Sequence, residues 1–348
     1  MGIVLTIYII RGDLMQKGII KLKNPPSIHS WACVGGEKEW EGPLGDKFDH
    51  IDLSGKFAMD TWETAENEAQ RLSFNLALKK GDLSPLEIDA LFAGDLINQC
   101  TASAYGLLSF DIPFFGIYGA CSTSAEGLTL AALTMDGGGY KYTATVCSSH
   151  FCSAERQFRY PLEYGGVRTP TSQWTVTSAA SFILSEKGEG PYIKELLPGI
   201  VRDGGINDAN NMGAAMAPAA VDTLCRYFKT SGRAPSFFDG IFTGDLGAEG
   251  ASILADLMHS EGYSVNQNYH DCGLLIYDRQ RQDMHAGGSG CGCSGAVLCT
   301  HILPKLKSGQ WHDVLYVATG AMMSPSSVQQ GLSIPGIAHL IHISSEKE

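Results

Sequence analysis

The stretch "SPLEIDALFAGDL" (Ser84–Leu96) recurs without gaps as "APSFFDGIFTGDL" (Ala234–Leu246), at a constant offset of 150 residues. In both places a helical pattern comes first, then a proline turn, an apolar strand, Gly-Asp and a second helical pattern. A repeat of this length predicts an internally duplicated α/β protein. Identical residues stand at equivalent places, namely Pro85 and Pro235, Asp89 and Asp239, Phe92 and Phe242, Gly94 and Gly244, and Asp95 and Asp245.

The pairing resumes further along the chain, where "GACSTSAEGLTLAALTMDGG" faces "GCGCSGAVLCTHILPKLKSG" and Cys121 falls near Cys293. The offset is now 172, so the second half carries about 22 additional residues, within Tyr263 to Gly287. We expect two similar halves, 21–190 and 191–348, in a layered α/β/α/β/α core, with 1–20 as an N-terminal extension. Ligands in such folds bind beyond the carboxyl ends of the strands, where the halves meet.

The composition describes a globular protein of 348 residues, with 44% apolar and 18% charged residues and a net charge of −12. This charge disfavours nucleic acid as a partner and means that an anionic ligand would need local positive charge. The ten cysteines lie mostly among apolar or small residues, which indicates free thiols in a reducing compartment. Neither Cys147/Cys152 nor Cys291/Cys293 has the usual zinc-ligand spacing, so no metal site is predicted.

The N-terminus holds an apolar run from Ile3 to Ile10. It lacks a basic region and a cleavage site, and it is too short to span a bilayer. We interpret it as an extra strand or as sequence upstream of a true start at Met15. No other segment resembles a transmembrane helix, so any association with a membrane is expected to be peripheral.

The segment "IYGACSTSAEG" (Ile117–Gly127) places Cys121 at a turn between a strand and a helix of small residues. The positive end of a helix dipole favours the thiolate form of a cysteine. Cys121 is therefore a candidate nucleophile.

The duplicated halves, with a cysteine at the start of one helix and a Gly-rich counterpart in the other, resemble the thiolase and β-ketoacyl synthase superfamily. From about Gly18 to the C-terminus the chain more closely resembles the stage V sporulation protein AD family of spore-forming Firmicutes. The motifs that carry this resemblance are "FAGDLINQ", "GACSTSAEG", "SSHFCSAERQFRYPLEYGG", "MGAAMAPAA", "FTGDLGAEG", "HDCGLLIY" and "AGGSGCGCSG".

The resemblance implies a function in sporulation and germination. It implies a soluble subunit that binds dipicolinic acid, with or without calcium, and no cofactor. The implied partners are the membrane-embedded subunits of the stage V sporulation A complex, at the forespore or spore inner membrane. A homodimer is expected by analogy with thiolase-like proteins.

Condensing enzymes of this superfamily pair the cysteine with histidines, and both histidine positions differ in this chain. The segment "TGDLGAEG" has none, and in "AGGSGCGCSG" the place is taken by Cys293 or Ser294. Without a general base, Cys121 is a poor nucleophile. We therefore predict a non-catalytic binding protein. The alternatives are an active acyltransferase that uses Cys121 and a scaffold with a vestigial pocket.

Dipicolinate is a flat aromatic dianion, which calls for guanidinium groups and an aromatic wall. Arg156 and Arg159 flank Phe158 in a connection that also contains His150. The predicted ligand site consists of these cationic residues, Cys121, and Cys293 and Ser294 of the Gly-rich loop. Alternatively, Glu155 and Glu163 pair with the two arginines and hold a loop or a dimer contact.

The repeated aspartates, Asp95 and Asp245, each precede a helical pattern. Such residues commonly cap helix N-termini, and that is the role we expect here. If calcium accompanies the ligand, one of these aspartates is a candidate contact.

Overall fold

A computed structural model describes residues 18–158, 168–265 and 267–347, so the apolar run Ile3–Ile10 and Arg159 lie outside the described residues. In the described part, the strands of each half form a five-stranded array with the orders β5-β4-β6-β8-β2 and β11-β10-β13-β14-β9. The two arrays join at one residue pair, Ser27 and Tyr192. The strands are β2 (Ser27–Gly35), β4 (Ala90–Gly94), β5 (Phe114–Gly116), β6 (Tyr142–Ser149) and β8 (Ser178–Ser185), then β9 (Tyr192–Leu197), β10 (Gly240–Thr243), β11 (Tyr269–Asp271), β13 (Asp313–Ala321) and β14 (Gly336–Ser344).

Strand directions repeat between the halves as well as strand order. β4 runs parallel to β5 and β6, just as β10 runs parallel to β11 and β13. β8 is antiparallel to β6 and β2, just as β14 is antiparallel to β13 and β9. The predicted duplicated α/β fold is therefore confirmed. The boundary between residues 190 and 191 stays a prediction.

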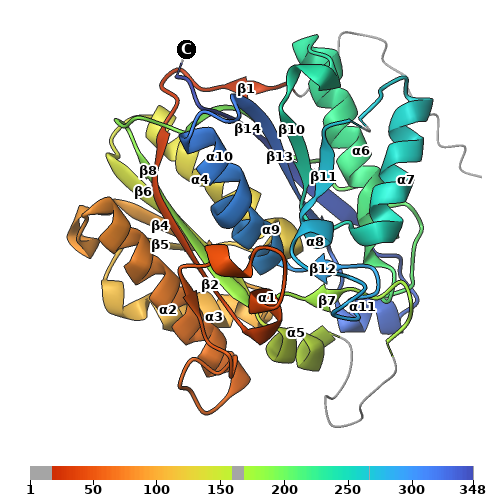
Figure 1. Ribbon diagram of the computed structural model, residues 1–348, viewed down its shortest axis with the longest axis horizontal. Coiled ribbons are helices and arrows are strands. Elements are labelled where there is room, and N and C mark those ends of the chain that lie inside the picture. The colour runs from red at the N-terminus through yellow and green to blue at the C-terminus, as the bar shows by residue number, and fades with distance from the viewer. Residues whose placement is uncertain (1–17, 159–167, 266, 348) are drawn as a thin grey trace, which may run out of the picture.

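The helices form three layers around the two arrays, which gives the predicted α/β/α/β/α order (Figure 1). α4 packs on strands of both arrays and against α9, and this central layer continues into α10. α2 and α3 cover the outer face of the first array, and α6, packed against α7, covers the second. These helices are α2 (Trp62–Gly81), α3 (Thr101–Leu107), α4 (Thr123–Asp136), α6 (Met212–Ser231), α7 (Gly247–Ser260), α9 (Cys291–Val297) and α10 (Leu303–Lys307), and a π-helical turn, η8 (Leu298–Ile302), joins the last two.

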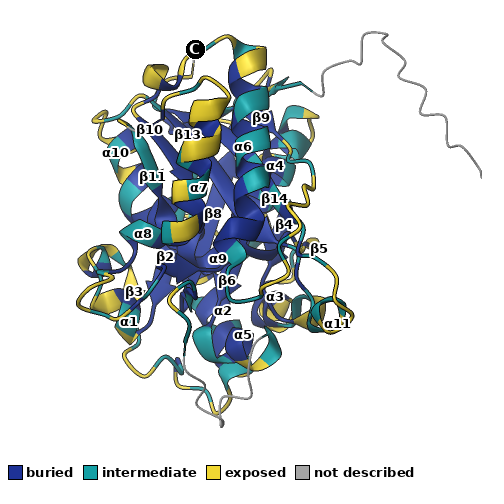
Figure 2. Cartoon of the chain, turned by 90° about the vertical axis from the view of Figure 1, so that its right-hand side faces the viewer, coloured by how far each residue is buried: buried dark blue, intermediate teal, exposed yellow. Residues whose placement is uncertain are grey.

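Shorter elements connect these layers in the described residues. They are β1 (Ile20–Lys21), α1 (Glu37–Trp40), β3 (His50–Ile51), α5 (Phe151–Phe158), β7 (Trp174–Thr175), α8 (Cys272–Leu275), β12 (Gly288–Ser289) and α11 (Pro325–Gln329), with 3-10 turns at Gly45–Lys47, Pro85–Glu87, Asn98–Cys100, Leu108–Phe110, Ala120–Ser122 and Pro235–Phe237. The strands and the central helices are mostly buried, and the exposed surface lies on the outer helices and loops (Figure 2).

The offset of 150 extends to the helix caps. The side chain of Thr61 accepts a hydrogen bond from the backbone at the start of α2, and that of Asn211 does the same for α6. Both helices end at a left-handed residue, Asp82 and Gly232 respectively. Because caps satisfy backbone groups that a helix end leaves unpaired, each half fixes the same helix boundaries by the same means.

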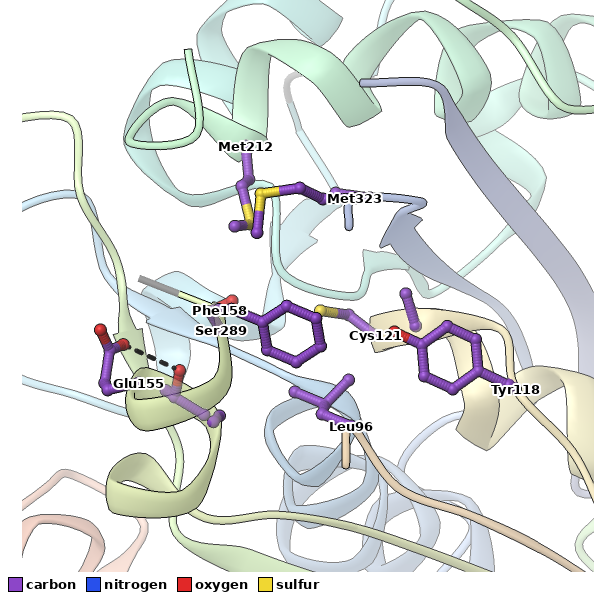
Figure 3. A pocket seen from close by; sticks show the side chains of 12 residues that line it. Leu96, Tyr118, Cys121, Glu155, Phe158, Met212, Ser289 and Met323 are labelled. Carbon is purple, nitrogen blue, oxygen red and sulfur yellow. Dashed lines mark hydrogen bonds between the residues drawn. The ribbon is translucent and has the colours of Figure 1, made fainter. Parts of the chain in front are cut away.

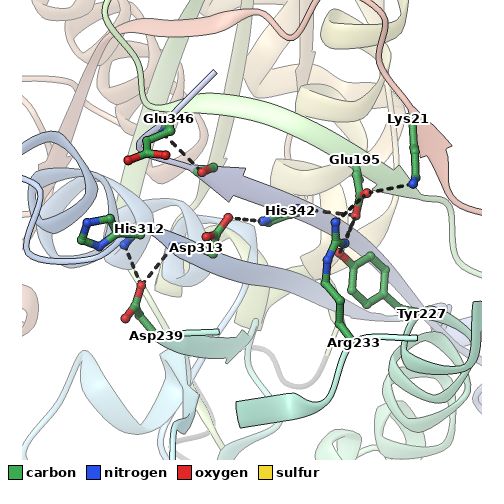
Figure 4. Close-up of polar contacts among 10 residues, drawn as sticks. Lys21, Glu195, Tyr227, Arg233, Asp239, His312, Asp313, His342 and Glu346 are labelled. Carbon is green, nitrogen blue, oxygen red and sulfur yellow. Dashed lines mark hydrogen bonds and ion pairs between the residues drawn. The ribbon is translucent and has the colours of Figure 1, made fainter. Parts of the chain in front are cut away.

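The first pair of repeated aspartates has one structural role in both halves. The carboxylate of Asp89 accepts the backbone N–H groups of Lys141 and Tyr142, at the start of β6. The carboxylate of Asp239 accepts those of His312 and Asp313, at the start of β13 (Figure 4). Each aspartate therefore ties its own strand to the next parallel strand.

The additional residues of the second half lie on both sides of β11. Phe114 pairs with Leu91 as Tyr269 pairs with Ile241, so the offset has grown from 150 to 155 at this strand. It reaches 172 only at Cys293. Most of the insertion therefore follows β11, where it forms α8 and reaches β12 beside the Cys121 region.

Candidate functional site

Cys121 lies at a junction of both halves. It sits in the 3-10 turn Ala120–Ser122 just before α4, and the preceding Ala120 has a left-handed backbone with φ of 51°. Its thiol hydrogen-bonds to the carboxyl group of Asp245, which follows β10. Ser289 and Gly290, at the start of α9, contact the same carboxyl group. Three strand-to-helix junctions thus converge on one point, as the duplicated topology predicts.

Asp245 is fully buried and heavily hydrogen-bonded. It accepts from the hydroxyl of Thr319 at 2.9 Å, from the backbone N–H of Gly290 at 2.8 Å and from the hydroxyl of Ser289 at 3.2 Å. Burial nevertheless raises the pKa of this carboxyl group above its ordinary value. Cys121 therefore lies beside a buried carboxyl group, with little access to water.

The expectation that the helix terminus favours a Cys121 thiolate is wrong. Burial raises the pKa of the Cys121 thiol well above its ordinary value, and the charge of Asp245 raises it further. Desolvation and a like charge oppose ionisation more strongly than a helix end, whose effect is about 1 kcal/mol, can favour it. Cys121 is held as a neutral thiol.

No histidine serves as a base for this thiol in the described part of the chain. Asp245 stands in the segment where condensing enzymes of this fold carry a histidine. His150, His270, His285 and His339 are absent from the described lining of the cavity at Cys121. The second histidine position is taken by α9, where Cys293 and Ser294 are both fully buried.

Cys121 lines a narrow cavity with a volume of about 30 Å³, room for about one or two water molecules. The ring of Phe158 stands over the sulfur atom, with Tyr118 and Leu96 on the other side (Figure 3). The hydroxyl of Thr175 bonds to the carboxyl group of Glu155 at 3.3 Å. The described lining comprises Leu96, Tyr118, Ala120, Cys121, Ala154, Glu155, Phe158, Thr175, Met212, Ser289, Ala321 and Met323, and contains no cation.

Helix α5 turns one face to this cavity and Arg156 to the other side. Ala154 and Phe158, four residues apart, line the cavity, whereas Arg156 is two residues from each and so lies on the opposite face. Its guanidinium is exposed and lies 3.1 Å from a carboxylate oxygen of Glu63. The predicted position of Arg156 beside Cys121 is therefore wrong, and that of Arg159 lies outside the described residues.

His150 is buried at the start of α5 and is also absent from the lining. Its Nε2 atom lies 2.7 Å from the carbonyl oxygen of Gly55, and its Nδ1 atom accepts the backbone N–H of Cys152 at 3.1 Å. Burial lowers its pKa. His150 thus fixes the start of a helix and a loop and does not face a ligand in this cavity.

The prediction that the two aspartates are N-cap residues is wrong, because Cys100 and Leu246 hold those positions, but Asp95 still binds the start of α3. Asp95 accepts the backbone N–H groups of Ile97 and, in the first turn of α3, Ser103. In the second half the corresponding helix start is bound by Asp271, which accepts the backbone N–H groups of Leu246 and Gly247. Asp245 is thereby released to meet Cys121.

Cys293 and Ser294 lie behind the cavity. The Ser294 hydroxyl is 2.9 Å from that of Ser124, and the latter is 2.6 Å from the hydroxyl of Tyr316. This buried cluster ties α4, α9 and β13 together, so the two residues hold the centre of the molecule and do not line the cavity.

Sequence reasoning missed a buried acid that adjoins the site. Glu66 of α2 accepts hydrogen bonds from Ser148 and from Ser153, which lies on α5. Burial and the charge of Asp95 raise the pKa of Glu66 to about 8. The sequence held one signal for it. Glu66 lies among the apolar positions of a predicted helix, where a charged residue is uncommon.

Among the described residues, no group of three or more His, Cys, Asp or Glu side chains is arranged to hold a metal ion. The helices there also include none that is both long and apolar enough to cross a bilayer.

Comparison with known proteins gives one family and one fold. Residues 16–344 match the family described as "Stage V sporulation protein AD (SpoVAD)". The protein of that name from Bacillus subtilis (strain 168) is 42% identical over 317 residues, which cover 91% of this chain and 94% of that protein.

A structure of OleA from Xanthomonas campestris aligns with a TM-score of 0.61 at 14% identity, over 93% of this chain and 99% of that one. The 3-oxoacyl-[acyl-carrier-protein] synthase III of Aquifex aeolicus VF5 aligns with a TM-score of 0.53 at 12% identity, over 92% and 99%. These two likenesses establish a thiolase-like fold.

Proposed function

The chain belongs to the stage V sporulation protein AD family, and on that premise we propose that it is a non-catalytic, dipicolinic acid-binding subunit of a spore inner-membrane channel complex. A role in sporulation follows from the family. The ligand, the complex and a part in germination belong to the proposal.

The observation that carries the non-catalytic part is the pairing of Cys121 with Asp245. Acyl transfer to a cysteine needs a thiolate and a group that takes up its proton. Here burial and a neighbouring carboxyl group raise the pKa of the thiol. The position is thus suited to lining a pocket inherited from an enzyme fold.

The cavity supports binding only after a local change. At about 30 Å³ it is far smaller than the few hundred Å³ of ordinary ligand pockets. Phe158 fills the space over Cys121 (Figure 3), so a flat aromatic ligand would enter as this ring turns aside. The rings of Phe158 and Tyr118 would then form the walls against the pyridine.

The charge of the lining favours a ligand without net charge. The described lining contains no cation that could balance the charge of a dianion. A dicarboxylate dianion bound to one calcium ion is neutral and needs no such cation. We therefore propose that calcium dipicolinate is the form that binds. Arg159, which follows Phe158 in the sequence, remains a proposed carboxylate contact.

Isothermal titration with dipicolinate, once with equimolar calcium and once with EDTA, tests this proposal. We expect binding with calcium and at least tenfold weaker binding without it. Cys121→Trp should abolish binding by filling the cavity, and Phe158→Ala should bind at least as tightly as the parent. Leu257→Trp, a bulky change on exposed α7, is the control and should bind normally.

Thermal melts show whether each variant is folded. If folded Cys121→Trp bound dipicolinate as the parent does, the ligand would lie elsewhere. If dipicolinate bound equally tightly with calcium and with EDTA, calcium would not be part of the bound ligand, and the proposed site would stand.

The alternative is an acyltransferase that uses Cys121. Incubation with acetyl-CoA followed by mass spectrometry of the Cys121 peptide distinguishes it. We expect no acyl adduct at this residue. Accumulation of a thioester on Cys121 during turnover would favour the alternative.

A further inference from the structure

A second and larger hollow lies away from the Cys121 cavity, between the first half and the central helix layer. Its volume is about 630 Å³, within the range of small-molecule sites. Trp31 of β2 lies on one side, and Thr300 and His301 of η8 lie on the other. We call this hollow the lysine groove, after Lys47, Lys80, Lys305 and Lys307, which line it. It shares no lining residue with the Cys121 cavity.

Two of the four lysines are already neutralised. Lys80 lies 2.7 Å from Asp49, and Lys47 lies 2.7 Å from Asp46. Lys305 and Lys307 form no ion pair with a carboxylate in the described part of the chain. The ammonium group of Lys307 reaches only the carbonyl oxygen of Gly190, at 3.3 Å.

Lys305 is held in place by aromatic neighbours. Its ammonium group lies 4.1 Å from the centre of the Trp311 ring and 3.4 Å from Nε2 of His301. Burial, with Lys305 itself, lowers the pKa of His301 to about 4, so this imidazole is neutral at pH 7 and does not compete for an anion. Burial also lowers the pKa of Lys305. A partly desolvated cation of this kind gains from a bound negative group.

The wall that carries these groups is a π-helical turn. η8 (Leu298–Ile302) interrupts the helix that otherwise runs from α9 to α10, and it contributes Cys299, Thr300 and His301 to the groove. π-turns are rare and occur often at functional sites. Its position at the groove is independent of the lysine charges.

We propose that the lysine groove is a binding site for a phosphate-bearing ligand, held chiefly by Lys305 and Lys307. An acidic protein with a net charge of −12 here leaves two lysines without a carboxylate partner among the described residues, in a hollow of ligand size. The groove is lined by lysines and by no arginine among the described residues. Arginine binds carboxylate and phosphate alike through its planar fork, whereas lysine acts as a point charge and is a common phosphate ligand.

The site is separate from the one proposed for dipicolinate. The start of α9 contacts Asp245, and Lys305 follows fifteen residues after Gly290, roughly 20 Å along a helix at 1.5 Å per residue. Phosphate could belong to a free anion or to a phospholipid headgroup, so the experiment uses a probe for each.

The first probe is sodium tripolyphosphate, measured by isothermal titration in 50 mM and 200 mM NaCl. The second is vesicles of phosphatidylglycerol and phosphatidylcholine, measured by flotation. We expect the parent to bind at least one probe, and more weakly at the higher salt. Lys305→Gln/Lys307→Gln should reduce that binding at least tenfold. Lys79→Gln/Lys229→Gln, which removes two exposed charges elsewhere, should change it less than twofold.

If the parent binds tripolyphosphate only, the ligand is a soluble anion. If it binds the vesicles only, and the groove variant does not, the ligand is a lipid headgroup. Either result supports the site. No binding of either probe by the parent would overturn the proposal, as would an equal loss in the control pair. The groove variant should bind dipicolinate as the parent does, so failure at one site is distinguishable from failure at the other.

Discussion

At the scale of single residues, the pairing of Cys121 with Asp245 decides the chemistry. The sequence showed that the histidines are missing, but it did not show what replaces them. Asp245 and Asp95 are equivalent by position, yet Asp271 takes the backbone N–H groups that an equivalent of Asp95 would bind. The offset had already changed before Asp271, so the repeat could not reveal this exchange.

Replacing Asp245 with asparagine should make Cys121 more reactive. The change removes the charge that adds to the raised thiol pKa, so more thiolate forms at a given pH. We expect alkylation of Cys121 by iodoacetamide at pH 8.5 to become at least threefold faster, measured by peptide mass spectrometry. Cys225, half-buried and remote, serves as the internal standard. Unchanged rates at both cysteines would contradict the role given to Asp245.

Glu66 should make stability depend on pH. Its folded pKa is about 8 and that of an unfolded glutamate is about 4.3. The folded state therefore holds the proton more tightly, so this contribution is present below about pH 4 and is lost as pH rises towards 8. The free energy of unfolding falls by at most about 1.4 kcal/mol per pH unit.

Glu66→Gln should remove this dependence, and thermal melts from pH 5 to 9 would reveal it. We expect the melting temperature of the parent to fall more steeply than that of the variant. Glu68→Gln, which removes the half-buried partner of the exposed Arg71, is the matched control and should follow the parent. Parallel curves for all three proteins would show that Glu66 is ionised throughout.

At the scale of elements, α5 shows what the sequence could and could not predict. The repeat predicted the strands and main helices because both halves had to obey one topology. α5 follows β6 as the shorter α11 follows β13, but its ligand residues were assigned from residue type alone. The face of a two-turn helix that meets a cavity depends on tertiary packing, which here turns Phe158 inward and Arg156 outward.

Arg156→Gln tests this orientation. Its pair with Glu63 is exposed, and such pairs contribute about 0–1 kcal/mol. We expect the melting temperature to change by less than about 2 °C and the affinity for calcium dipicolinate to change less than twofold. A tenfold loss of affinity in a folded variant would show that Arg156 contacts the ligand and would contradict its outward orientation.

At the scale of the whole molecule, strand β5 is the edge of the first array that no other described strand pairs with. Phe114 and Phe115 on this strand, and Tyr105 and Leu108 beside it in sequence on α3 and the following turn, are all exposed. An apolar edge strand is a template for pairing with another chain. We propose that the expected homodimer forms along this edge.

Leu108→Lys/Phe115→Lys should shift the protein from dimer to monomer in light scattering coupled to size exclusion. The added charges would be buried in a paired edge. Leu86→Lys, at another highly exposed leucine, should leave the mass unchanged. A parent that is already monomeric at micromolar concentration would contradict the proposal.

The π-turn in the central helix has a consequence for how this sequence can change. An α-helix turns by about 100° per residue, whereas the wider π-turn takes up one additional residue and lets the helix after it keep its direction. Deleting a single residue between Leu298 and Ile302 should therefore restore α-helical geometry there and reshape the wall that η8 contributes to the groove, while Leu306 stays buried. At this point of the chain a one-codon length change would alter one wall of the groove without turning α10, so variation in length here is a record of selection on the groove.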